Sequence, residues 1–159
     1  MKTSLAILLS CLWLGAAALS PGCSSASAST QSAESGATDV VQRWAAAFTE
    51  SDVDTIVSLY APDALFFGTG SQTLVTQPAD IRSYFDTALN RDKPRGAELL
   101  EHSVRVVSDD VVVITGMDRV SGTRDGAVYS TDGRVTFVLQ KRDGAWQIVH
   151  FHRSAVPTS

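Results

Sequence analysis

Cysteine is scarce in this sequence, and its scarcity excludes several kinds of site. The 159 residues include two cysteines, Cys11 and Cys23, and none follows position 23. A disulfide framework, a cysteine nucleophile and a thiolate metal site are therefore excluded from the rest of the chain. The stability of that part has to come from an ordinary apolar core.

Basic charge is also scarce. The formal net charge is −4, and removal of residues 1–22 would take away only Lys2, leaving 12 basic against 17 acidic side chains and a net charge of −5. Affinity for the phosphate backbone of nucleic acid comes from Lys and Arg on a basic surface. We therefore expect no nucleic-acid partner.

The chain has no apolar run of the length that favours a transmembrane helix. Its longest, Leu5 to Leu19, spans 15 residues and follows the short basic start Met1-Lys2-Thr3. A run of this length behind a basic start is typical of the core of a signal peptide. We therefore expect residues 1–22 to be an export signal.

Two cleavage patterns follow the signal. Leu19-Ser20-Pro21-Gly22-Cys23 resembles a bacterial lipobox, in which the cysteine thiol would carry the lipid, whereas Ala26-Ser27-Ala28 is typical of ordinary signal peptidase. We favour acylation of Cys23 over soluble export. The protein is then expected in the bacterial periplasm or at the outer membrane as a lipoprotein, in contact with the membrane only through that anchor.

The remaining chain divides into a tether and one domain. Residues 23–37 are rich in Ser and Ala and are predicted to form a flexible tether. The domain, residues 38–157, begins with Thr38 as a helix N-cap. Apolar side chains at helical spacing predict three helices, and these stripes are Val40, Val41, Trp44, Ala47 and Phe48, then Val53, Ile56, Val57 and Tyr60, then Ile81, Tyr84, Phe85, Ala88 and Leu89.

The second half of the domain alternates with a period of two, which is typical of strands. Four long strands are predicted, Glu98–Val107, Val111–Val120, Val128–Lys141 and Trp146–Ser154, after a small hairpin formed by Ala64–Phe67 and Thr73–Val75. Asp143-Gly144 predicts a turn and Asp132-Gly133 a bulge. The fold class is therefore α+β, with three N-terminal helices packed on a strongly curved antiparallel sheet.

The last strand also carries a family likeness. Arg142 to Ser154 reads Arg-Asp-Gly-Ala-Trp-Gln-Ile-Val-His-Phe-His-Arg-Ser, and it strongly resembles the last strand of the association domain of calcium/calmodulin-dependent protein kinase II. The resemblance covers Asp39 to Pro157. It implies the cone-shaped nuclear transport factor 2-like fold, which also houses SnoaL-type cyclases and ketosteroid isomerases. A kinase catalytic domain is excluded, because the sequence has no glycine-rich nucleotide loop, no His-Arg-Asp and no Asp-Phe-Gly.

The resemblance also implies a ligand cavity. In the association domain the arginine that matches Arg153 lines a cavity that accepts carboxylates, and arginines stand near the positions of Phe137 and Met117. The cavity is then expected to be more apolar here, with Arg119 or Arg134 within reach. The alternative for Arg153 is a structural ion pair with an internal acid such as Asp63 or Asp86. Further candidate lining residues are Tyr60, Tyr84 and His152.

Catalytic and metal-binding roles have weaker support. Enzymes of this fold place acid/base groups deep in the cone. The candidates for such a role here are Tyr60, Asp63, Tyr84, Asp86, Asp118 and His152. No catalytic set is recognisable by spacing. His150 and His152 share a face of the strand, but a zinc site needs further ligands and only His102 remains. We expect no metal and no cofactor.

Strand alternation finally predicts an assembly. It places Trp146, Ile148, His150, His152 and Ser154 on one face and Gln147, Val149, Phe151 and Arg153 on the other. Because both faces are largely apolar, a homodimer or larger ring is expected to cover one of them.

We interpret the chain as an exported module that binds a small, partly apolar ligand, with a carboxylate favoured. The alternatives are an isomerase, cyclase or hydrolase that uses the same cavity, and a structural oligomerisation module.

Overall fold

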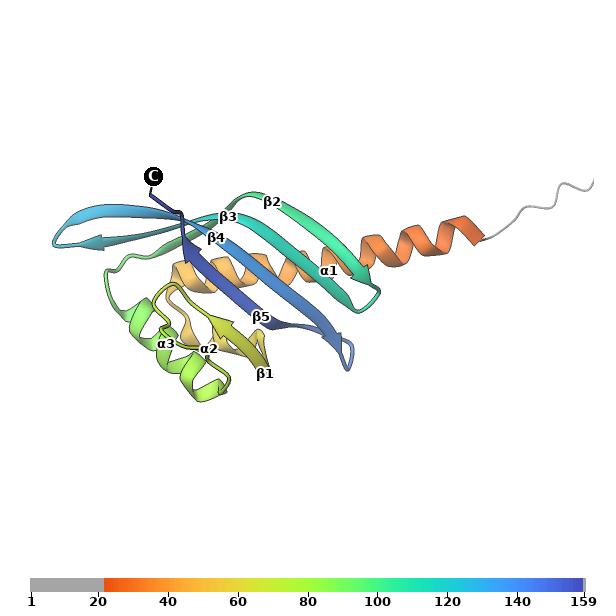
Figure 1. Ribbon diagram of the computed structural model, residues 1–159, viewed down its shortest axis with the longest axis horizontal. Coiled ribbons are helices and arrows are strands. Elements are labelled where there is room, and N and C mark those ends of the chain that lie inside the picture. The colour runs from red at the N-terminus through yellow and green to blue at the C-terminus, as the bar shows by residue number, and fades with distance from the viewer. Residues whose placement is uncertain (1–21, 159) are drawn as a thin grey trace, which may run out of the picture.

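The computed structural model describes residues 22–158 and shows helices packed against one face of a curved sheet (Figure 1). The elements in chain order are α1 (Gly22–Glu50), α2 (Val53–Ser58), β1 (Tyr60–Phe67), α3 (Pro78–Asn90), β2 (Gly96–Ser108), β3 (Val111–Arg124), β4 (Ala127–Arg142) and β5 (Ala145–Ala155). The strands form one sheet in the order β1-β5-β4-β3-β2. The predicted α+β arrangement is confirmed.

Helix α1 is longer than the sequence predicted, because it extends back through the segment expected to be a tether. Ala33 and Ala37 are buried and continue the stripe of Val40, Val41 and Trp44 by another two turns. A side chain at Gly36 would clash with the indole of Trp146, so this glycine lets the helix approach β5 closely. The signal peptide predicted before Gly22 and the lipidation predicted at the Cys23 side chain lie outside what the structure describes. Among residues 22–158, no helix is both long and apolar enough to span a membrane.

Helix α2 begins where the sequence predicted but ends earlier. The carboxylate of Asp52 accepts a hydrogen bond from the Thr55 amide at 3.0 Å and caps the helix. The helix ends at Ser58, and Tyr60 opens β1 instead of closing the helical stripe. Pro62 is tolerated because β1 is an edge strand. The prediction of Tyr60 in a helix is therefore wrong, although its ring is buried as expected.

The sheet is mixed, since β1 runs parallel to β5 while the other pairs are antiparallel. The expected small hairpin is reduced to a single bridge between Phe66 and Val75. The predicted turn at Asp143-Gly144 is confirmed, with positive φ at both residues.

The predicted bulge at Asp132-Gly133 is wrong, because β3 and β4 pair without interruption there. A Cβ atom at Gly133 would lie 2.6 Å from the guanidinium of Arg153 and from a carboxylate oxygen of Asp118. The glycine therefore makes room for two charged side chains.

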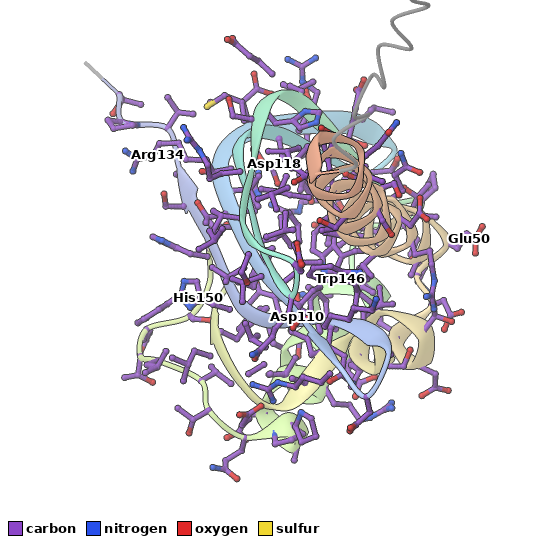
Figure 2. All side chains as sticks on the ribbon, turned by 90° about the vertical axis from the view of Figure 1, so that its right-hand side faces the viewer. Glu50, Asp110, Asp118, Arg134, Trp146 and His150 are labelled. Carbon is purple, nitrogen blue, oxygen red and sulfur yellow. The ribbon has the colours of Figure 1, made fainter. Side chains whose placement is uncertain are left out.

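An irregularity occurs instead in β5, where Val138 and Leu139 of β4 pair with His150 and Ile148 and Val149 is the extra residue. This bulge changes which residues share a face. Ile148, Phe151 and Arg153 are buried on the helix side, while His152 is exposed. Figure 2 shows Trp146 between the sheet and α1 and His150 on the opposite side of the sheet. The predicted faces of this strand are therefore wrong beyond Ile148.

Aromatic rings fill the space between the helices and the sheet. Trp44 lies at the centre, with the rings of Phe137 and Phe151 each 5.4 Å away between centroids. Its indole nitrogen donates to the hydroxyl of Tyr60 at 2.9 Å. Phe66 and Phe85 extend the cluster toward α3. The space between the helices and the sheet is thus a packed core over most of the length of the sheet.

Candidate functional site

A buried ion pair lies at the end of the aromatic core. Arg153 donates from Nε to both carboxylate oxygens of Asp118, at 2.9 and 2.7 Å. Its Nη1 donates to Thr69 Oγ1 at 2.8 Å and its Nη2 to the Thr131 carbonyl at 3.1 Å. Asp118 is 3% exposed and Arg153 9%. The internal acid is therefore neither Asp63 nor Asp86, and every nitrogen of this guanidinium has a protein partner.

The structure does not bring the six predicted lining residues together. Arg153, Phe137 and Tyr60 are buried on the helix side of the sheet, and Phe137 has no exposed surface. Met117 precedes the inward Asp118 and pairs with the exposed Arg134, so strand alternation puts it on the outer face with His152. Figure 2 shows Asp118 toward α1 and Arg134 on the far side of the sheet.

Tyr84 is the one predicted residue that lines a large cavity. An open groove of about 710 Å³ lies between α3, the loop after β1, the connection from α3 to β2, and the end of β3. Its charged lining residues are Arg91, Arg95, Arg124, Asp80 and Asp92. We call it the basic groove, because three cations face two carboxylates in a chain that is acidic overall.

Within the basic groove, Arg124 and Asp92 neutralise each other. Arg124 donates from Nε and Nη2 to the two oxygens of Asp92, and Tyr129 donates to the same carboxylate at 2.9 Å. Arg124 first and Tyr129 second lower the pKa of Asp92 from 3.8 to about 2. This cluster ties the β3–β4 hairpin to the connection that carries Arg95.

Arg95 differs from Arg124, because no ion pair found within residues 22–158 includes it. Its Nη1 donates to the hydroxyl of Tyr129 at 2.7 Å, and its guanidinium lies 5.3 Å from the centre of the Phe48 ring. Its Nε is buried without a hydrogen-bond partner. Arg95 is thus a partly buried cation on the wall of a groove, held in place by neutral groups, and its charge also acts on the nearby carboxylate of Asp92 without an ion pair.

Tyr84 separates this groove from the aromatic core. Its ring makes edge contacts with Phe66 and Phe85 at centroid distances of 4.8 and 5.4 Å. A side chain at Gly68 would overlap the phenol, so glycine at this position permits the contact. Burial raises the pKa of the Tyr84 hydroxyl, opposed by backbone hydrogen bonding from Gly70 and by the charge of Arg153. The phenol therefore stays protonated at neutral pH.

The outer face of the sheet carries a mixture of apolar and polar side chains. Cross-strand pairing places Leu65, His150, Val138 and Val113 in one row from β1 to β3. Leu65 is 42% exposed. Desolvation first, and the charge of His152 second, lower the pKa of His150. No group of three His, Cys, Asp or Glu side chains suited to a metal ion occurs in the described part of the chain.

Sequence reasoning missed the groove arginines. Arg91, Lys93 and Arg95 stand within five residues between α3 and β2, and this local excess of positive charge was the available signal. Arg124 carried no such signal, because it reaches the groove only through the β3–β4 hairpin.

Comparisons with known proteins agree with this fold. Residues 38–159 match the sequence model of the SnoaL-like domain family. Over 80 residues the chain is 38% identical to the calcium/calmodulin-dependent protein kinase type II subunit delta of Oryctolagus cuniculus, a match that takes in 48% of this chain and 15% of that subunit. The chain thus corresponds to a small part of that relative.

The solved structures that are similar in shape include two kinase II association domains. A candidate calcium/calmodulin-dependent protein kinase II association domain from Xanthomonas campestris is 30% identical, with a TM-score of 0.71 over 77% of this chain and 86% of that one. The association domain of the C. elegans kinase II is 22% identical, with a TM-score of 0.68 over 80% and 98% of the two chains, and shows likeness of fold alone.

Proposed function

Because the chain belongs to the SnoaL-like domain family and has the nuclear transport factor 2-like fold of the kinase II association domains, we propose that it is a non-kinase module that binds a small, partly apolar carboxylate in the basic groove. Arg95 is the residue that recognises the acid. Arg91, at the exposed end of the same wall, adds positive charge.

The observation that carries this proposal is the guanidinium of Arg95, which forms no ion pair within residues 22–158. A partly buried cation is stabilised by an anion, and a carboxylate can accept two of its N–H groups at once. Arg153 is the other inward-facing arginine considered for this role, but Asp118 already neutralises it. The basic groove therefore offers the better anion site.

The groove also accounts for an apolar part of the ligand. Val75, Ala88 and the ring of Tyr84 line it beside the charged groups. A volume of about 710 Å³ lies within the range of cavities that bind small molecules. An aromatic or short aliphatic acid would place its carboxylate at Arg95 and its apolar body against Tyr84.

Acid/base catalysis has less support than binding. Both oxygens of Asp118 accept from Arg153, and the carboxylate is nearly inaccessible to solvent. Burial raises the pKa of Tyr60 well above 10, although the indole of Trp44 opposes this. Neither group is presented to a substrate in the groove.

Assembly and location complete the proposal. The homodimer would cover the outer face of the sheet, and its support is the row that contains Leu65, Val138 and Val113. Export rests on the sequence of residues 1–22, with Cys23 as the site of a lipid anchor.

A matched pair of ligands tests the binding proposal. Calorimetry on the full chain should detect 4-ethylbenzoate and should find 4-ethylbenzamide at least about tenfold weaker, because a charge-assisted hydrogen bond contributes about 1.5–3 kcal/mol. Equal affinity for the acid and the amide, or binding of neither, would remove the carboxylate from the proposal.

A further inference from the structure

A second cavity lies on the other side of the aromatic core and shares no lining residue with the basic groove. Its outer part is a cleft of about 320 Å³ between α1 and strands β2 and β3, lined mainly by apolar surface. Its inner part is a void of about 10 Å³ that reaches Trp44, Phe137 and Asp118. Val41, Ala45 and Leu99 line both parts, so the two adjoin.

Asp118 lines the inner void, and its carboxylate has unused capacity to accept hydrogen bonds. Among the described residues its side-chain donor is a single N–H group, the Nε of Arg153, shared between Oδ1 and Oδ2. An ionised carboxylate offers about four acceptor positions. Each further hydrogen-bond donor stabilises a carboxylate on a residue that is 3% exposed, because water has little access to it.

We propose that this cleft binds a small apolar molecule that carries one neutral hydrogen-bond donor, such as a phenol or an alcohol, with the donor directed at Asp118. The size of the inner void sets the class of the polar group. About 10 Å³ admits one water-sized group, which a hydroxyl matches and a carboxylate exceeds. The negative charge of Asp118 also disfavours an anion there. The apolar body of the ligand occupies the outer cleft against Val41, Ala45 and Leu99.

The cleft is expected to bind a neutral hydrogen-bond donor and the basic groove an anion, so each site can be tested without the other. The cleft is expected to take 4-ethylphenol, and the groove 4-ethylbenzoate. Trp44 lines the inner void and its indole N–H donates to Tyr60, so the resonance of this indole reports on occupation of the cleft.

The experiment uses nuclear magnetic resonance titration of the full chain and two substitutions on α1. Ala45→Leu fills the cleft where its two parts adjoin, whereas Ala46→Leu adds the same group on the exposed face of the helix. We expect 4-ethylphenol to shift the Trp44 indole resonance and to bind Ala45→Leu at least about tenfold more weakly, with Ala46→Leu and Arg95→Gln unchanged. The methyl ether of 4-ethylphenol, which lacks the donor, should bind at least about tenfold more weakly to the natural protein.

Three outcomes would overturn the inference. They are absence of 4-ethylphenol binding, equal binding by Ala45→Leu, and equal affinity for the phenol and its methyl ether. In the last case the inner void holds water and Asp118 is purely structural. None of these results bears on the binding of 4-ethylbenzoate to the groove.

Discussion

Removal of the charge at Asp118 should destabilise the fold strongly. In Asp118→Asn, Arg153 keeps the Thr69 hydroxyl and the Thr131 carbonyl but loses its anion. The lost charge-assisted hydrogen bond accounts for about 1.5–3 kcal/mol. The unpaired buried guanidinium raises the total to about 3–5 kcal/mol. Because the free energy of unfolding of a native domain is about 5–15 kcal/mol, the loss is a large fraction of the stability.

The same sheet supplies a matched control. Asp132 pairs with Arg119 at 2.7 Å, but their side chains are 42% and 47% exposed. Water screens this pair, so Asp132→Asn should leave the free energy of unfolding almost unchanged. Urea unfolding followed by far-ultraviolet circular dichroism measures both variants.

A double variant distinguishes the cost of leaving one buried charge unpaired from the contribution of the ion pair itself. Asp118→Leu with Arg153→Met replaces both charges by apolar groups, and such replacements are often neutral or stabilising. We expect the free energy of unfolding of the double variant to be higher than that of Asp118→Asn. If Asp118→Asn and Asp132→Asn differ by less than about 1 kcal/mol, the pair is solvated and the argument from its burial fails.

Three further predictions concern the anchor, the groove and the assembly. Cys23→Ala should abolish fatty-acid labelling in a bacterial host, and labelling that survives would rule out the lipoprotein. The folded pKa of Asp92 is about 2 against an ordinary 3.8, so its stabilisation is present above pH 4 and is lost as the pH falls toward 2. Thermal unfolding should show that loss, and Asp92→Asn should lack it; equal pH profiles would contradict the assignment. Light scattering should give twice the monomer mass for the natural chain and for Val128→Glu at the exposed hairpin, but the monomer mass for Val138→Glu on the outer face. A natural chain that is monomeric at micromolar concentration would exclude the dimer.

Much of the fold was predictable because it depends on local patterns. The stripe around Trp44, Asp52 as a cap, Pro78 at the first turn of α3 and the Asp143-Gly144 turn each act within a few residues. The errors arose where tertiary contacts decide. Tyr60 fits a helical stripe as well as a strand, and its pairing with Ile148 of β5 chose the strand.

The candidate site was less predictable for the same reason. Val149 gives no sign in the sequence that it is an extra residue in β5, yet it decides that Arg153 faces inward and His152 outward. The partner of Arg153 lies 35 positions away on β3. No spacing rule selects Asp118 from the other acids, since the pairing depends on the register of three strands.

The central claim is that Arg95 recognises a carboxylate in the basic groove. Calorimetry with 4-ethylbenzoate on the natural chain, Arg95→Gln and Arg43→Gln tests it most directly, because Arg43 is exposed on α1 outside the groove. We predict that Arg95→Gln weakens binding by about 10–100-fold, the scale of one charge-assisted contact, and that Arg43→Gln leaves it unchanged. Equal affinity of Arg95→Gln and the natural chain would contradict the account.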